Sequence, residues 1–253
     1  MDALVAVRFL RFGGIAAASL LTCAPMLLAR RPRTPLRVLC ISAFEYLARL
    51  NGRRLRRTER IALGCACDFG ALRNDFYDQR ELNRPSYRKL RCRLRQIAPR
   101  AATLRYIREL RQMERDRPAC GPDGFSEPHA VVEYRTRVLE VSLSWLQAIS
   151  LRSLEPRLFQ GLVALVGLVQ LVDDLIDWKD DWACRRPTYV TAFLRQWAHP
   201  PSAGVTHIRF RANRFRHLIV AATGRRPELV PLMLAGGMVW LMAIGLMRIR
   251  FGE

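Results

Sequence analysis

The spacing of apolar residues is the feature that most constrains the fold of this chain. Apolar residues recur every three or four positions, as in Leu139, Leu143 and Leu146, and no segment alternates apolar and polar residues as a half-buried strand would. Turn-forming pairs such as Asn51-Gly52 separate the periodic segments. The chain is therefore predicted to be all-α, with helices over residues 36–50, 58–79, 86–97, 100–115, 127–151, 155–182, 187–197, 206–222 and 226–248.

Composition and charge narrow the functional classes. Half of the 253 residues are hydrophobic and a quarter are charged, which predicts a folded protein. Seven scattered cysteines do not suggest a disulfide framework, so we expect a reducing cytoplasm. The net charge of +20 favours an anionic partner, which is a nucleic acid, an anionic bilayer surface or a phosphorylated substrate.

Two apolar runs lie near the ends of the sequence. Residues 1–35, with arginines on both sides of an apolar run, are predicted to form a separate segment that associates with a membrane or is buried. Residues 36–253 are predicted to form one helical domain. The run Leu229–Met247 has no charge over 19 residues and could just span a bilayer, but a buried or interfacial helix is favoured. The expected location is cytoplasmic, peripheral to the inner membrane or anchored there.

The strongest motif lies between residues 170 and 181. Five of the chain's 22 acidic residues fall within nine positions there, directly after an apolar stretch. Carboxylates this close disfavour one another's ionised form unless a cation lies between them, and oxygen ligands favour Mg²⁺. A solvated helix end, paired with Arg185 and Arg186, is the alternative. On a helix, one face would carry Gln170, Asp173, Asp174, Asp177 and Asp181.

Another acidic segment, which lies earlier in the chain, strengthens the hypothesis of a metal site. Asp68, Asp75 and Asp78 are spaced at i, i+7 and i+10, so one helical face carries all three after an apolar stretch. Two amphipathic helices would then each present an acidic patch. Facing each other, they would hold metal ions over an apolar cavity.

These motifs resemble those of the class I isoprenoid synthase superfamily, the trans-prenyl diphosphate synthases and class I terpene synthases. The segment at residues 170–181 resembles the second of the family's two Asp-rich motifs, and we call it the second motif. Asp173-Asp174-x-x-Asp177 matches the motif itself, Gln170 matches the glutamine before it, and Asp181 matches the aspartate after it. The resemblance covers roughly residues 58–190 and is more specific here than in the first motif.

The first motif is a variant of the family pattern. Asn74-Asp75-x-x-Asp78 stands where the family has D-D-x-x-D, and Arg84 aligns with one of the two arginines that follow. The G-K-x-x-R element that prenyl synthases use for the second substrate is not found upstream. Its absence weakens the hypothesis that the activity is chain elongation.

The resemblance implies a single-domain helical bundle around a central apolar cavity. It implies an enzyme that ionises a polyprenyl diphosphate to a carbocation, with catalytic residues Asp75, Asp78, Asp173, Asp174 and Asp177. Several Mg²⁺ ions would be held by Asn74, Asp75, Asp78, Asp173, Asp174, Asp177 and Asp181. The candidates for binding the substrate are Arg80, Arg84, Arg135, Gln170, Lys179, Arg185 and Arg186. Aromatic residues near the motifs, including Phe69, Trp145 and Trp178, are expected mostly to pack in the core, with a minority lining the pocket.

Several alternatives stay open at this point. Cyclisation and prenyl transfer are not distinguished, and a non-catalytic membrane-associated relative or accessory subunit is a further hypothesis, supported by Asn74 and the apolar ends. The expected partners are a prenyl diphosphate and an anionic membrane surface. Nucleic-acid binding is not expected, because no helix-turn-helix, zinc-finger or RNA-binding signature accompanies the charge. The oligomeric state is left open, a homodimer included.

Overall fold

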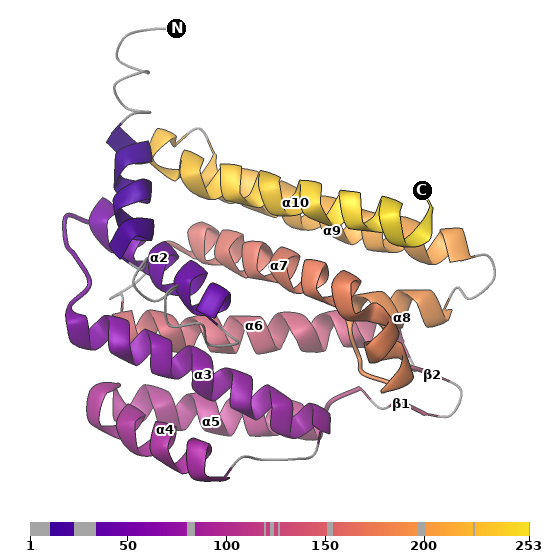
Figure 1. Ribbon diagram of the computed structural model, residues 1–253, viewed down its shortest axis with the longest axis horizontal. Helices are drawn as coiled ribbons and strands as arrows, with labels where there is room; N and C mark the ends of the chain where they lie inside the picture. The colour runs from indigo at the N-terminus through magenta and orange to yellow at the C-terminus, as the bar shows by residue number, and fades with distance from the viewer. Residues whose placement is uncertain are drawn as a thin grey trace, which may run out of the picture. The chain divides into compact units, whose positions relative to one another are not determined.

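The computed structural model describes residues 11–22, 34–79, 84–118, 120–121, 124–125, 127–150, 154–196, 201–224 and 226–252. These residues are almost entirely helical (Figure 1), so the predicted all-α class is confirmed. A two-residue antiparallel pairing, β1 (Cys120–Gly121) with β2 (Gly124–Phe125), is the exception within the described ranges. The isoprenoid-synthase-like bundle with a central cavity remains a prediction.

The observed helices begin and end close to the predicted positions. The largest difference is at α9, which begins at Pro201 rather than at residue 206, because proline suits the first turn of a helix. The elements are α2 (Thr34–Leu50), α3 (Arg57–Gln79), α4 (Arg84–Ile97), α5 (Arg100–Arg115), α6 (Pro128–Ser150), α7 (Pro156–Ala183), α8 (Tyr189–Gln196), α9 (Pro201–Thr223), the 3-10 helix η1 (Pro227–Leu229) and α10 (Val230–Phe251). A further helix covers residues 11–22.

The contacts divide the chain into two compact units, which we describe separately. Unit 1 comprises Met1–Glu109 and Ser142–Leu154, and unit 2 comprises Leu110–Val141 and Glu155–Glu253.

An aromatic cluster forms part of the core of unit 1. The ring of Phe69 on α3 lies 5.1 Å from that of Tyr87 and 6.0 Å from that of Trp145, measured between centroids. Trp145 stacks on Tyr106 at 4.1 Å and donates its indole N–H to Thr103 Oγ1 at 3.2 Å. Phe69 and Trp145 are therefore packing residues, as expected for most aromatic residues near the motifs.

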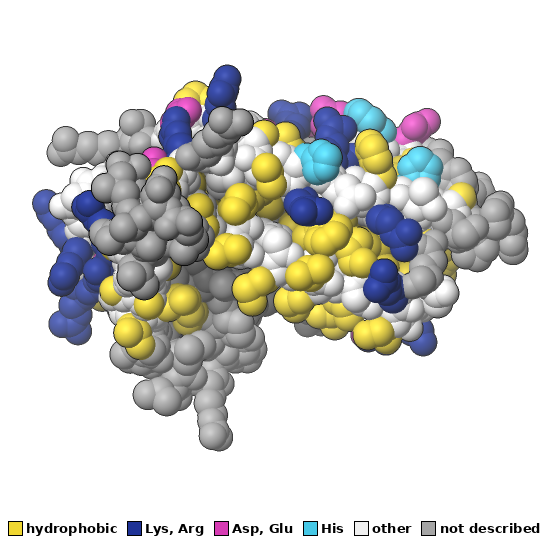
Figure 2. Space-filling model, turned by 90° about the horizontal axis from the view of Figure 1, so that it is seen from above, with side chains coloured by type: hydrophobic (Ala, Val, Ile, Leu, Met, Phe, Trp, Pro, Cys, Tyr) yellow, Lys and Arg dark blue, Asp and Glu magenta, His cyan; other side chains and the backbone are white. Residues whose placement is uncertain are grey.

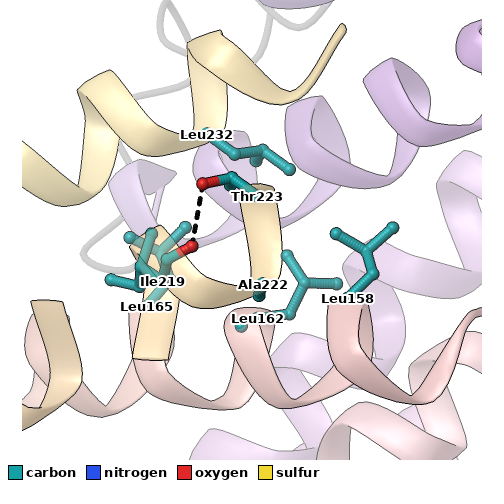
Figure 3. Close-up of a pocket in the computed structure, with 8 residues that line it drawn as sticks. Leu158, Leu162, Leu165, Ile219, Ala222, Thr223 and Leu232 are labelled. Atoms are coloured by element: carbon teal, nitrogen blue, oxygen red, sulfur yellow. Dashed lines mark hydrogen bonds between the residues drawn. The ribbon is translucent and has the colours of Figure 1, made fainter. Parts of the chain in front are cut away.

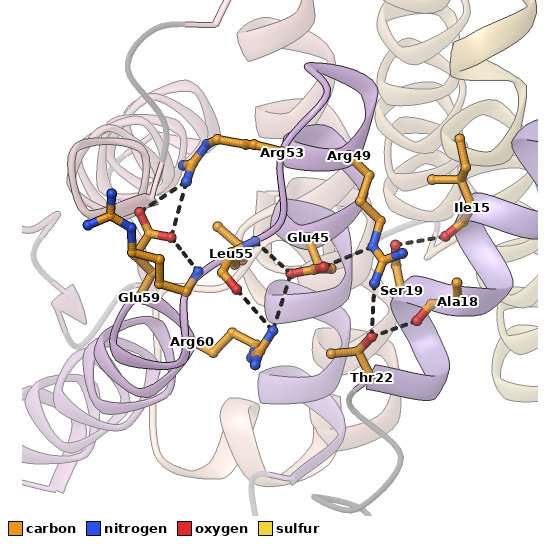
Figure 4. Close-up of polar contacts among 11 residues, drawn as sticks. Ile15, Ala18, Ser19, Thr22, Glu45, Arg49, Arg53, Leu55, Glu59 and Arg60 are labelled. Atoms are coloured by element: carbon orange, nitrogen blue, oxygen red, sulfur yellow. Dashed lines mark hydrogen bonds and ion pairs between the residues drawn. The ribbon is translucent and has the colours of Figure 1, made fainter.

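A fully buried carboxylate, Glu45, organises the other part of unit 1 (Figure 4). It accepts hydrogen bonds from Arg49 Nε at 2.8 Å and from the Leu55 N–H at 3.1 Å, and it pairs with Arg60 at 3.7 Å. Arg49 also donates to Thr22 Oγ1 at 3.3 Å, which ties the helix of residues 11–22 to α2. A buried charge is stable only when it is paired and hydrogen-bonded, and Glu45 meets both conditions.

Three long helices, α7, α9 and α10, pack against one another in unit 2 (Figure 1). Leu168, Leu171 and Leu175 lie on one side of α7 and are completely buried. The helices approach closely at Gly161, where an added Cβ atom would lie 2.4 Å from the Cβ of Ala222 on α9. The apolar side of α7 thus contributes a large part of the core of unit 2, together with residues of α8, α9 and α10.

A small apolar hollow remains between these helices (Figure 3). Its volume is about 10 Å³, no more than a single water molecule needs. Thr223, on its rim, donates its hydroxyl hydrogen to the Ile219 carbonyl at 2.9 Å, so its polar group is satisfied. The hollow is a packing defect and not a ligand site.

Candidate functional site

The acidic motif occupies the last three turns of α7, and the way this helix ends shapes the site. The Arg186 N–H donates to the Asp181 carbonyl at 2.8 Å and the Arg185 N–H to the Trp182 carbonyl at 3.1 Å. Arg185 has a φ of 54°, in the left-handed region. This is the hydrogen-bond pattern of a Schellman motif, which reverses the chain at the end of a helix. The reversal brings the Arg186 side chain back to Asp181, where Nη1 donates to Oδ1 at 3.0 Å.

Asp174 is the most tightly held residue of the motif. It is 4% exposed. Its Oδ1 accepts from Arg135 Nη2 on α6 at 2.7 Å, and its Oδ2 accepts from the Tyr189 N–H at 2.9 Å. That N–H belongs to the first residue of α8, where backbone donors have no partner inside the helix. Asp174 therefore joins three helices, α6, α7 and α8.

Three carboxyl groups of the motif have raised pKa values. Burial raises the pKa of Asp174 to about 6, against the lowering effects of Arg135 and the Tyr189 N–H. Burial also raises the pKa of Asp173, and the neighbouring Asp177 carboxylate raises it further. The pKa of Asp181 is raised by burial and lowered by Arg186. Arg135 lowers all three pKa values, so its guanidinium is within electrostatic reach of most of the motif.

The acidic face of α7 is partly buried and partly exposed to solvent. Asp174 and Asp181 lie on its buried flank, paired with Arg135 and Arg186, whereas Asp173 and Asp177 lie on its exposed flank. All four carboxylates lie along one side of α7 as expected for a helix, but two of them are buried and two are exposed. Their common role as metal ligands stays a prediction. Asp180, which the sequence analysis left out, belongs to the exposed flank, since 173, 177 and 180 follow the spacing i, i+4 and i+7.

Sequence reasoning also missed the turn that connects α7 to α8. Thr191 Oγ1 accepts from the Thr188 N–H at 3.0 Å, and Thr188 Oγ1 accepts from the Thr191 N–H at 3.2 Å. Two hydroxyl residues three positions apart thus satisfy each other's backbone donors, as in a capping box. The pattern Thr188-x-x-Thr191 just before an apolar run was the available signal.

The described residues do not contain a preformed group of three or more His, Cys, Asp or Glu side chains placed to hold a metal. Both oxygens of Asp174 are taken by protein donors, and Asp181 is bound to Arg186. Asp173 and Asp177 fit a Mg²⁺ ion better, because Mg²⁺ needs only one or two carboxylates when water and phosphate complete its shell. Gln170, one turn earlier, has a buried side-chain oxygen that has no hydrogen-bond partner among the described residues.

The other predicted site residues are less informative. Lys179 is exposed, with its ammonium 5.9 Å from the Trp178 ring centroid, and Arg185 and Arg84 are exposed as well. Arg80 lies outside the described residues, and so do the side chains of Asn74, Asp75 and Asp78. Upstream of the first motif on α3, Asp68 accepts a hydrogen bond from Arg37 Nε at 2.5 Å within unit 1.

We compared the chain with models of known protein families, with curated proteins and with solved structures, and found no match. Hypotheses about its activity rest on the motifs and on the geometry described above.

Proposed function

We propose that the chain is a Mg²⁺-dependent enzyme of the class I isoprenoid synthase type that ionises a polyprenyl diphosphate. The observation that carries the proposal is the pair Asp173 and Asp177, which are exposed and one helical turn apart next to the Arg135–Asp174 ion pair. Burial raises the pKa of Asp173, and repulsion from the Asp177 carboxylate raises it further. A divalent cation between them would remove this repulsion.

The chemistry needs a charged leaving group to be held and neutralised. Bound Mg²⁺ would supply Lewis-acid stabilisation of the diphosphate. Asp173 and Asp177 would hold the metal, and Arg135 and Arg186 would add positive charge on the buried side of the motif. The allylic C–O bond then breaks, its electron pair leaves with the diphosphate, and an allylic carbocation remains. Cyclisation of this cation needs no second substrate, whereas prenyl transfer needs isopentenyl diphosphate, whose double bond supplies electrons to the cation.

The ion pairs of Asp174 and Asp181 give these residues a different role from the other two carboxylates. They hold Arg135 and Arg186 in place and attach α8 to α7. They are positioning residues in this proposal.

The proposal is tested by neutralising one exposed carboxylate in the proposed metal site and, as a control, one outside it. Purified full-length wild type, Asp177→Asn and Glu133→Gln are incubated with geranyl, farnesyl and geranylgeranyl diphosphates, with and without Mg²⁺ and isopentenyl diphosphate. Glu133 is exposed on α6 and controls for the loss of one negative charge. We expect Mg²⁺-dependent release of diphosphate that falls by at least about tenfold in Asp177→Asn and not in Glu133→Gln. Equal activity of all three proteins would contradict the assigned role of Asp177.

A second function, a non-catalytic membrane-associated relative or accessory subunit, is favoured by one observation. Two of the four predicted metal ligands on α7 are neutralised by the chain's own arginines. Absence of turnover with every substrate, together with no thermal stabilisation by Mg²⁺ plus inorganic diphosphate, would support this function over the enzyme.

A further inference from the structure

The helix α10 is apolar on all sides, although only one side is buried. No charged residue occurs from Val230 to Met247. One side packs against α7 and α9 through Leu232, Gly236, Ala243 and Met247. The opposite side carries large apolar side chains that are 53–79% exposed, namely Leu234, Met238, Leu241, Met242 and Ile249. A helix that is apolar all round normally lies inside a protein core or in lipid.

The exposed apolar surface continues onto α9. Phe210, Leu218 and Val220 are 62%, 41% and 46% exposed. A groove of about 470 Å³ lies between the two helices, and its lining includes Arg216, Val220, Leu234, Met238, Trp240 and Leu241. Figure 2 looks onto these helices and shows the hydrophobic side chains gathered in a broad band. We call the exposed apolar side of α10, the three α9 residues and this groove the α10 surface.

Arginine dominates the charged residues of the segment that carries the α10 surface. Residues 201–251 contain eight arginines and one acidic residue, Glu228. The guanidinium of Arg216 lies 4.4 Å from the ring centroid of Trp240, and the Trp240 N–H donates to Asn213 Oδ1 at 2.9 Å. Arg248 and Arg250 are exposed at the end of α10. An apolar strip bordered by arginine and tryptophan is complementary to the acyl chains and anionic headgroups of a lipid bilayer.

We propose that the α10 surface binds an anionic lipid bilayer, with α10 lying in the plane of the headgroup region. The segment Pro227–Phe251, which comprises η1 and α10, is long and apolar enough to span a membrane. Only 22% of its most apolar 18-residue stretch is buried in the protein. Spanning would require it to leave α7 and α9, exposing the buried core of unit 2, whereas lying in the interface keeps that core intact. A second copy of the chain is a poorer occupant, because it would bring two arginine-rich surfaces of the same sign together.

The proposal is independent of catalysis and is tested by vesicle flotation of the full chain. The probes are vesicles of mixed phosphatidylglycerol and phosphatidylcholine, and vesicles of phosphatidylcholine alone. We expect binding to the anionic vesicles that weakens with salt and is released by alkaline extraction, with much weaker binding to the neutral ones. Failure to bind anionic vesicles at low salt, or retention after alkaline extraction, would overturn the proposal.

A matched pair of variants locates the surface. Met238→Glu places a carboxylate on the α10 surface, and Leu104→Glu places one at an exposed apolar position on α5. We expect vesicle affinity to fall at least about tenfold in Met238→Glu and to stay unchanged in Leu104→Glu. Ile249→Glu, at a position that is 79% exposed, repeats the test at the end of the helix. Equal affinities in Met238→Glu and wild type, or a concentration-dependent dimer of the wild type that Met238→Glu dissociates, would overturn the assignment.

Discussion

At the scale of single residues, buried acidic groups are paired with arginine. Glu45, Asp174 and Asp181 are at most 6% exposed, and each binds at least one arginine of its own unit. Removing one partner of such a pair leaves a buried charge uncompensated, which costs about 3–5 kcal/mol. The acids that matter for stability are therefore distinct from the exposed acids that we assign to the metal.

The pH dependence of stability should reveal Asp174. Its pKa of about 6 in the folded state is above its ordinary value of 3.8, so the folded chain binds the proton more tightly. Stability should therefore fall as the pH rises from about 4 to above 6, by roughly 3 kcal/mol from this group. Urea unfolding across this range should show the decrease in wild type and a smaller one in Asp174→Asn. The same slope in both proteins would contradict the raised pKa.

Substitution of Arg185 by glycine should stabilise the protein. A non-glycine residue with a φ of 54° carries a steric cost that glycine avoids. We expect Arg185→Gly to raise the free energy of unfolding by about 1 kcal/mol. Cys184→Gly is the control, because Cys184 has an ordinary φ of −83° and glycine only adds flexibility there. Destabilisation of similar size in both variants would show that the left-handed cost is absent.

At the scale of elements, close packing of α7 on α9 defines unit 2. Glycine at position 161 allows the approach to Ala222. At Gly245 on α10, no described atom outside its own stretch of helix lies within 4 Å of the place where a Cβ atom would lie. The same substitution should therefore have opposite effects at the two positions.

We expect Gly161→Ala to destabilise the protein by about 1–3 kcal/mol, because the new methyl group overlaps with α9. Gly245→Ala should stabilise it by about 0.5–1 kcal/mol through lower backbone entropy in the unfolded chain. Chemical denaturation of both variants measures the difference. Stabilisation by Gly161→Ala would mean that the helices are farther apart than the structure places them.

At the scale of the whole molecule, the net charge of +20 dominates the electrostatics. Repulsion among dispersed arginines destabilises the compact state, and salt screens this repulsion. We expect the midpoint of thermal unfolding to rise when sodium chloride is added to a low-salt buffer. A double variant, Arg248→Gln with Arg250→Gln, should show a smaller rise because it carries two fewer charges. A midpoint that falls with salt would indicate that attractive ion pairs outweigh the repulsion.

Local sequence determined the secondary structure and the position of the acidic motif. The hydrogen bonds of a helix join residues four positions apart, so periodicity and breakers sufficed to place α3, α5 and α7 within a few residues. The same periodicity placed Asp173, Asp174, Asp177 and Asp181 on one side of α7. It could not show which of these four side chains are buried and which are exposed to solvent.

Only the tertiary structure decided which of those carboxylates are exposed. Arg135 lies 39 positions from Asp174, and the Tyr189 N–H reaches it only because the chain reverses at Arg185. The exposure of α10 was equally hidden, because a run without charge indicates an apolar environment on every side and does not say whether protein or lipid supplies it. Local interactions decide the helices, whereas the burial of each side chain depends on neighbours that are remote in sequence.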